Sequence, residues 1–324
     1  MPPLAANSTL AGEAKESFEA PAIEERRIRR RHRFEFWLFQ KLKHWAEHAS
    51  EASRSRMARM FEGAMWLGKV RQDVVEANLR IAFPDWTESE RTRLARQNLR
   101  WFLQFSMDVL RMGAWQEHTA QEVRFENREV LDEALAEQRG VLMVGGHFGN
   151  WEYLCPALSQ HGYSTSMYVG RQTNPLVDRL QNEQRLRSRI QTIGKGRQAT
   201  AEILQALKAN RALGMLVDQD ERKSGVFVDF FGVSASSSRG AAAFHLLQKS
   251  PVVFFSCAYE SGGVSIEFER IAFRTSGHQE RDVRELTSRI QQALEQRIRS
   301  HPEQYFWMHR RWRTRPEGAP ELYE

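Results

Sequence analysis

The residues whose spacing is most suggestive of chemistry are His147 and Glu152, in the segment GGHFGNWE at positions 145–152. A histidine can accept a proton near neutral pH. A carboxylate on its other ring nitrogen fixes the tautomer and stabilises the imidazolium that forms. Because the segment holds no serine or cysteine, we expect the base to activate a hydroxyl of the substrate. The pattern therefore indicates acyl transfer to an alcohol.

The residues around this pair predict how the chain positions it. The apolar run Val141–Val144 reads as a buried strand, and the glycines after it allow a sharp turn and close approach of a ligand. Ligands gather at the carboxyl ends of such strands. We expect a helix over 148–158, which Pro156 could kink or end. Positions i and i+5 of a helix point about 140° apart, so the pair can form only if His147 precedes the helix. The alternative is an ordinary buried histidine.

The rest of the chain predicts an α/β fold, a mixed sheet flanked by helices with a helical N-terminal region. In that region, Thr87 and Glu90 form a capping box that opens a helix. We divide the chain into a disordered basic tail (1–33), the helical region (34–125), an α/β core (126–316) and a tail (317–324). Further strands are expected at 164–168, 213–217, 225–231, 252–259 and 264–268, and further helices at 128–137, 175–189, 198–209, 239–248 and 280–300.

Composition narrows the class of protein. The 324 residues are 41% hydrophobic and carry a formal charge of +6, which favours anionic partners such as nucleic acid, anionic lipid or an acidic carrier protein. The mean hydropathy of −0.59 argues against a polytopic membrane protein. We find neither a signal-peptide pattern nor an apolar run of about 18 residues. Cys155 and Cys257 stand in apolar surroundings, as buried thiols do in a reducing compartment.

The N-terminal region contains a candidate membrane contact. Six arginines between Arg26 and Arg33 precede apolar residues at helical spacing, with lysines interleaved. A basic cluster followed by an aromatic amphipathic helix suits an interfacial anchor. A helix packed on its own domain would show the same pattern, and both interpretations stay open. The apolar residues are Phe34, Trp37, Leu38, Leu42 and Trp45.

At this point a family resemblance becomes visible. GGHFGNWE resembles the His-x4-Asp/Glu motif of glycerolipid-type acyltransferases, and more closely that of the bacterial lipid A biosynthesis lauroyl/myristoyl acyltransferase family. Further blocks agree in order, so that the resemblance spans about residues 70–316. They are NLRIAFPDW (78–86), YVGRQTNPLVD (168–178), VDQD (217–220) with GVFVDFFG (225–232), and HPEQYFWMHRRW (301–312).

The resemblance implies a reaction and its partners. The donor would be an acyl carrier protein thioester, and the acceptor a hydroxyl of a lipid A precursor, commonly the 3-hydroxyl of an acyl chain already attached. His147 would be the general base and Glu152 its orienting partner. No cofactor, metal or nucleic acid is expected. Where such proteins begin with an apolar anchor, this chain has the basic segment, so we expect peripheral attachment to an anionic membrane surface, on the cytoplasmic face of the inner membrane.

Other positions are candidate substrate-binding residues. Arg171, or backbone donors near the glycine turn, could hold the oxyanion of the tetrahedral intermediate. Arg171 could instead bind a phosphate or form a surface salt bridge. Asp218, Gln219 and Asp220 follow a strand and could position a basic group or a sugar hydroxyl. A metal site is less favoured there, because no further ligand stands at suitable spacing. The remaining candidates are Asn150, Asn174, Arg239 and Arg310.

For two of these candidates, an ordinary structural role is an alternative to ligand binding. Arg239 follows three serines before a predicted helix, where an anion could bind, although ordinary helix capping explains the serines equally well. Arg310 belongs to a basic aromatic cluster that could line a phosphate or membrane site or lie at a solvated edge.

Three rival functions remain open. The first is the same chemistry on a phospholipid or a mannosylated inositol lipid, and the second is a non-catalytic binder of anionic surfaces. A cysteine-based acyl-enzyme at Cys155 is the third, and it is the least favoured because that residue more plausibly packs against the sheet.

Overall fold

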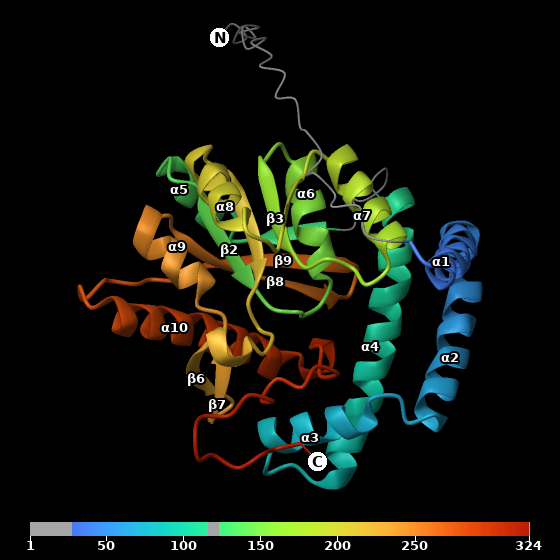
Figure 1. The fold of residues 1–324 in the computed structure, drawn as a ribbon. Helices are drawn as coiled ribbons and strands as arrows, with labels where there is room; N and C mark the ends of the chain where they lie inside the picture. Colours follow the sequence, from blue (N-terminus) through green and yellow to red (C-terminus); the bar gives the residue numbers. More distant parts are fainter. Residues whose placement is uncertain (1–27, 116–122, 324) are drawn as a thin grey trace, which may run out of the picture.

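The computed structural model describes residues 28–115 and 123–323, and these form a mixed sheet flanked by helices, as predicted (Figure 1). The seven strands lie in the order β1-β9-β8-β2-β5-β3-β4. All neighbours are parallel except β8 and β9, which are antiparallel. The strands are β1 (Val123–Glu126), β2 (Val141–Gly145), β3 (Thr165–Val169), β4 (Gln191–Gly194), β5 (Ala212–Leu216), β8 (Val252–Glu260) and β9 (Gly263–Arg270).

Strand β2 is buried on both faces, which explains its unbroken apolar sequence. Leu142 and Val144 belong to one core with α8 and α10, whereas Val141 and Met143 belong to a second core with α5 and α6. The helices around the sheet are α5 (Arg128–Ala136), α6 (Leu154–Gln160), α7 (Pro175–Arg187), α8 (Ala199–Lys208), α9 (Gly240–Gln248) and α10 (Gln279–Ser300).

A separate antiparallel hairpin packs against α10. It consists of β6 (Val226–Phe230) and β7 (Val233–Ser237), and its tight turn contains Phe231 and Gly232, both with positive φ. Three short 3-10 helices complete the core region: η2 (Trp151–Tyr153), η3 (Arg222–Ser224) and η4 (Pro302–Gln304).

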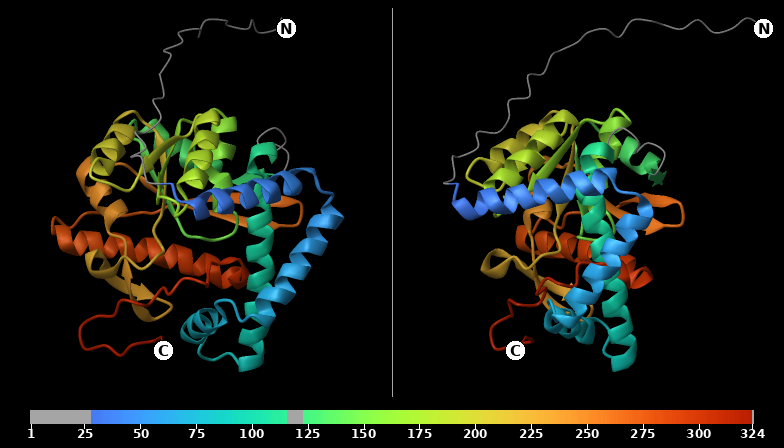
Figure 2. Two further views of the ribbon diagram at one scale, coloured as in Figure 1. Left: turned by 45° about the vertical axis from the view of Figure 1, so that its right-hand side comes forward. Right: turned by 90° about the vertical axis from the view of Figure 1, so that its right-hand side faces the viewer.

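Four helices form the N-terminal region: α1 (Arg30–His48), α2 (Glu51–Leu67), α3 (Gln72–Ala82) and α4 (Glu88–Trp115). The long helix α4 lies between the sheet and the outer pair α1 and α2 (Figures 1 and 2). The predicted capping box is confirmed, because the Thr87 backbone N–H donates to Glu90 at 2.7 Å and the Glu90 N–H donates to Thr87 Oγ1 at 3.3 Å.

Helix α1 does not present the single apolar stripe that its spacing suggested. Leu42 and Trp45 pack inward against a small cluster that includes Ala46 and Met107, whereas Phe34, Trp37 and Leu38 are exposed. The inward residues fit a helix packed on its own domain, whereas the membrane contact stays a prediction. The helix begins at Arg30, inside the range assigned to the tail, and the expected disorder of 1–27 lies outside the described residues.

The predicted strands all occur, within two residues at each end, but β1, β4 and β7 were not predicted. Strand β1 lies at the end of the range assigned to the helical region, and β7 reads VSASS, which has little apolar character. The predicted helix over 148–158 is shorter. Residues 148–150 form a turn, and α6 begins only at Leu154. Pro156 lies in the first turn of α6, where its missing N–H costs no hydrogen bond.

Candidate active site

The segment that follows β2 is held in a fixed turn. Gly149 has a φ of +60°, and a Cβ atom there would lie 1.7 Å from the carbonyl oxygen of Cys257. Its N–H donates to the Gln304 carbonyl at 2.8 Å, and the next N–H, of Asn150, donates to the Cys257 carbonyl at 2.7 Å. The turn is therefore clamped between β8 and the C-terminal segment, and only glycine fits at position 149.

This turn brings His147 to Asp218. The Nδ1 atom of His147 lies 2.7 Å from Asp218 Oδ1, and its backbone N–H donates to Asp218 Oδ2 at 2.9 Å. Both residues follow the ends of adjacent parallel strands, since Gly145 of β2 pairs with Leu216 of β5. The His147 side chain is 20% exposed and that of Asp218 is 3% exposed. A buried carboxylate thus holds one ring nitrogen of a histidine whose other nitrogen is accessible.

The surroundings keep Asp218 ionised. Burial alone would raise the pKa of this carboxyl. The charge and hydrogen bonds of His147 and the charge of Arg311 outweigh burial and lower the pKa to about 2. Arg311 is itself 1% exposed and donates to Ser236 O, Ser237 Oγ and Gln291 Oε1. Burial followed by the nearby Asp218 charge raises the pKa of Tyr305 well above its usual range, so its hydroxyl stays protonated.

Glu152 lies in a different arrangement from the one expected. Its Oε2 forms an ion pair with Arg185 of α7 at 3.5 Å. It belongs to η2, after the turn that carries His147. The carboxylate that accepts from His147 Nδ1 is Asp218, because strand pairing brings the ends of β2 and β5 together. Sequence spacing alone pointed to the nearer acid.

Aromatic residues shape the exposed side of His147. The ring of Trp151 meets the imidazole edge to face at 4.9 Å between centroids, and the ring of Phe306 lies at 6.0 Å. The Phe306 N–H donates to the His147 carbonyl at 3.0 Å. The C-terminal block of the chain therefore forms part of the site.

Gln219 lies beside the free ring nitrogen. Its side-chain nitrogen is 3.5 Å from His147 Nε2, and the residue is exposed. By contrast, the backbone N–H groups of residues 147–150 already donate to Asp218, Gly146, Gln304 and Cys257. The glycine turn therefore does not offer those four N–H groups to an oxyanion. The side-chain amide of Gln219 is a donor beside the nitrogen that would take the proton.

Two other predicted residues, Asn150 and Asn174, have contacts that the sequence did not indicate, and a third, Arg171, lies in a loop. Asn150 is fully buried and donates through Nδ2 to the hydroxyl of Tyr259 at 2.8 Å. Asn174 caps α7 by accepting from the Leu176 N–H at 3.0 Å, and its Nδ2 donates to the carbonyl of His32 in α1 at 2.9 Å. Arg171 lies exposed in the loop after β3.

The remaining predicted residues lie farther along the chain. Asp220 accepts from the Thr314 side chain at 2.9 Å, and its N–H donates to His309 Nε2 at 3.0 Å, so it fastens the C-terminal segment. Arg239 pairs with Glu280 on the surface at 2.6 Å. Arg310 lies 3.8 Å from Asp73 of α3. Of the two adjacent arginines, Arg311 is the one whose charge acts on Asp218. The sequence alone could not tell which of the two would do so.

The structure also bears on a cysteine nucleophile. Cys155 is buried, and burial followed by the charge of Glu152 raises the pKa of its thiol to about 12. A thiol with such a pKa stays protonated and is a poor nucleophile. Both cysteines are free and buried, as predicted.

A histidine that a buried carboxylate orients at the carboxyl end of a central strand has the geometry that a general base needs in group transfer. Comparison with known proteins identifies the family. Residues 23–314 match the model of the bacterial lipid A biosynthesis acyltransferases, and the chain belongs to this family. The acyltransferase class that the sequence predicted is thereby confirmed.

Curated relatives agree with this assignment. A lipid A biosynthesis lauroyltransferase of Escherichia coli K12 is 28% identical over 261 residues, which cover 79% of this chain and 83% of that protein. A lipid A biosynthesis acyltransferase of Haemophilus influenzae is 29% identical over 265 residues, or 80% and 83%. A phosphatidylinositol mannoside acyltransferase of Mycobacterium tuberculosis is 26% identical over 185 residues, or 56% and 57%. Among residues 28–115 and 123–323, no helix is long and apolar enough to span a bilayer.

Proposed function

We propose that the protein transfers a fatty acyl group from an acyl carrier protein thioester to a hydroxyl of a lipid A precursor, with His147 as general base. The observation that carries this proposal is the 2.7 Å contact between His147 Nδ1 and Asp218 in a chain of this family. Asp218 holds the imidazole so that Nε2 faces the accessible side. In this proposal Asp218 takes the orienting role that the sequence had suggested for Glu152.

The reaction follows from this geometry. The acceptor hydroxyl gives its proton to His147 Nε2 while its oxygen attacks the thioester carbonyl carbon. The tetrahedral intermediate collapses, the carbon–sulfur bond breaks, and the leaving thiolate takes the proton back from the imidazolium. The ionised Asp218 stabilises that imidazolium between the two steps. General-base assistance of this kind contributes about 10²–10⁴ in rate.

We place the oxyanion near Gln219. Its amide is beside Nε2, where the attacking oxygen must lie, and a single preorganised donor contributes about 10²–10³ in rate. Arg171, which follows β3 on the same edge of the sheet, remains a second candidate for the oxyanion or for a phosphate of the acceptor.

The test is an assay with purified protein, acyl carrier protein thioester and a lipid A precursor. We expect a product heavier by one acyl group, and a loss of at least about a hundredfold in turnover for His147→Ala with folding retained. An acyl-coenzyme A thioester as alternative donor tests the carrier. Near-normal turnover of His147→Ala would place the base elsewhere, and consumption of thioester without acylation of the precursor would move the acceptor to another lipid.

A second acceptor class has a specific observation in its favour. The match to a phosphatidylinositol mannoside acyltransferase covers 56% of this chain. The longer matches to lipid A enzymes favour the lipid A precursor. Running both acceptors in the same assay separates the two.

We further propose that the protein attaches peripherally to the cytoplasmic face of the inner membrane through α1. Phe34, Trp37 and Leu38 are more than half exposed on this arginine- and lysine-rich helix, a combination that suits an interfacial helix. The double variant Phe34→Ser/Trp37→Ser should lose binding to anionic liposomes, whereas Gln40→Ser, an exposed change on the same helix, should not. Unchanged binding of the double variant would exclude this anchor.

A further inference from the structure

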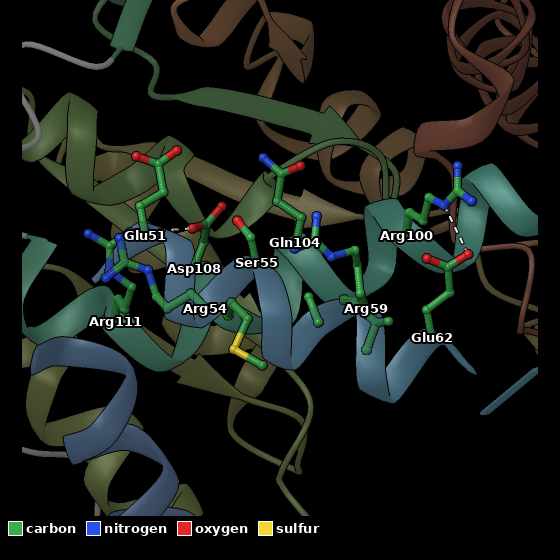
Figure 3. Close-up of a pocket in the computed structure, with 12 residues that line it drawn as sticks. Glu51, Arg54, Ser55, Arg59, Glu62, Arg100, Gln104, Asp108 and Arg111 are labelled. Carbon is green, nitrogen blue, oxygen red and sulfur yellow. Dashed lines mark hydrogen bonds and ion pairs between the residues drawn. The ribbon is translucent and has the colours of Figure 1, made fainter. Parts of the chain in front are cut away.

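A cleft of about 710 Å³ opens between α2 and α4 (Figure 3). Helix α2 lies on the side of α4 away from the sheet (Figure 2). Four arginines line it, Arg54 and Arg59 from α2 and Arg100 and Arg111 from α4. Figure 3 shows Arg54 and Arg111 gathered beside Asp108 at one end and Arg100 with Glu62 at the other.

Arginines outnumber carboxylates among the residues that line the cleft. Burial, followed by the like charge of Arg111, lowers the pKa of Arg54. The Nε atom of Arg111 is buried, and no group in the described part of the chain accepts its hydrogen. Asp108 lies 3.7 Å from Arg111, but its Oδ2 already accepts from the Tyr259 hydroxyl at 2.7 Å. The cleft therefore holds four arginines and three carboxylates, Glu51, Glu62 and Asp108, and Asp108 is partly engaged elsewhere.

The floor of the cleft is apolar. It is formed by Leu103 and Met107 of α4, which are buried from solvent. A site with fork-shaped cations beside apolar surface suits a ligand that combines a phosphate with a hydrocarbon chain, because guanidinium groups bind phosphate oxygens in pairs.

We propose that the α2–α4 cleft binds the phosphate headgroup of an anionic lipid, with Arg54 and Arg111 as its principal ligands. The lipid chain lies along the apolar floor formed by Leu103 and Met107. This goes beyond the acyl transfer proposed above, since it assigns a separate binding site that does not include His147.

A hydrogen-bond chain connects this cleft with the catalytic turn. Asp108 accepts from the hydroxyl of Tyr259, and that hydroxyl accepts from Nδ2 of Asn150, three residues after His147. Burial, followed by the charge of Asp108, raises the pKa of Tyr259 well above its usual range, so the hydroxyl keeps its proton. The chain fixes Asp108 in the cleft wall relative to the turn.

The probe is dihexanoyl phosphatidic acid below its micelle concentration, titrated into the full-length protein by isothermal calorimetry. We expect saturable binding that Arg54→Gln and Arg111→Gln each weaken by about tenfold or more, since each removes a charge-assisted contact. The matched control is Arg56→Gln, which makes the same charge change on α2 at an exposed position outside the cleft, and it should change binding less than twofold.

Further binding measurements distinguish a lipid site from a free-phosphate site and from a net-charge effect. Inorganic phosphate should bind at least tenfold more weakly, and equal affinity would overturn the lipid assignment in favour of free phosphate. An equal loss in Arg56→Gln would show that binding follows net charge and would overturn the site. Should Arg111→Gln fail to fold, exposed Arg59→Gln gives the same test, with a loss of several-fold expected. His147→Ala should bind normally, so the result is independent of the proposed catalysis.

Discussion

His147 Nδ1 and Asp218 Oδ1 lie 2.7 Å apart although 71 positions separate the two residues in the chain. The parallel pairing of β2 with β5 makes the contact possible, because both strands end at the same edge of the sheet. Glu152, only five positions from His147, is instead ion-paired with Arg185. The two acids therefore hold different partners, and their substitution should have different consequences.

We expect Asp218→Asn to lower kcat by about 10²–10⁴-fold, because the imidazolium loses its counter-charge and the tautomer is no longer fixed. Glu152→Gln should keep kcat within about tenfold, because the bond to His147 Nδ1 is left intact. Steady-state kinetics of both variants with the same thioester donor make the comparison. The reverse order of effects would return the orienting role to Glu152.

Replacing Gln219 by leucine should lower kcat by about a hundredfold with little change in KM, because an oxyanion donor acts mainly in the transition state. Gln219→Glu should be at least as damaging, since it places a negative charge where negative charge develops. Arg171→Gln serves as the comparison on the other candidate donor. If Gln219→Leu retained full kcat while Arg171→Gln lost it, the oxyanion would be assigned to Arg171.

The pKa of Asp218 predicts how stability depends on pH. Its value of about 2 in the folded protein is below the ordinary value of 3.8, so the unfolded chain binds its proton more readily. The carboxylate therefore contributes stability above about pH 4, and this contribution is lost as the pH falls toward 2. The free energy of unfolding of the protein should exceed that of Asp218→Asn most at about pH 5, and the gap should narrow on acidification. If this difference in the free energy of unfolding widened below pH 4, the prediction would be wrong.

The sequence predicted the parts of this molecule that depend on local pattern. The apolar run of β2, the capping box of Thr87 and Glu90, and the order of strands and helices in the core all follow from spacing and residue type. Strand β7 was not predicted, because its serines give it little apolar character. Two of these serines are buried in the structure, where they form hydrogen bonds to groups distant in the chain. Ser237 Oγ, for example, accepts from Arg311.

The site was predictable only in part, because it too depends on contacts between residues distant in the chain. His147 follows a recognisable strand and turn, so its place at the sheet edge could be inferred. Its partner depends on which strand lies next to β2, and sequence spacing does not specify strand order. Asn174 and Asp220 look equally functional in the sequence, yet their contacts fasten α1 and the C-terminal segment. Arg310 and Arg311 differ only in which side of the chain each faces.

Asn78 of α3 should be important for stability rather than chemistry. It is fully buried, and its Nδ2 donates to the carbonyls of Trp307 at 2.6 Å and His309 at 2.7 Å, which fixes the C-terminal block that lines the site. Asn78→Ala leaves those acceptors unsatisfied and should cost about 2–4 kcal/mol in the free energy of unfolding. Arg80→Gln removes only an exposed pair with Glu76 and should cost less than about 0.5 kcal/mol in urea denaturation. Equal costs would show that the Asn78 contacts carry no stability.

Two glycines with positive φ separate backbone strain from close contact. Gly162 has a φ of +85° and open space around its Cα, so Gly162→Ala should cost about 1–2 kcal/mol, from conformation alone. Gly149→Ala adds a clash with the Cys257 carbonyl, because β8 passes against the turn at that point. The turn would have to leave β8, and His147 would move with it. We therefore expect a much larger fall in the thermal midpoint than for Gly162→Ala, together with loss of turnover even in the fraction that folds. Similar midpoints for the two variants would mean that the turn can shift without cost, and the clamp between β8 and the C-terminal segment would then not be what positions His147.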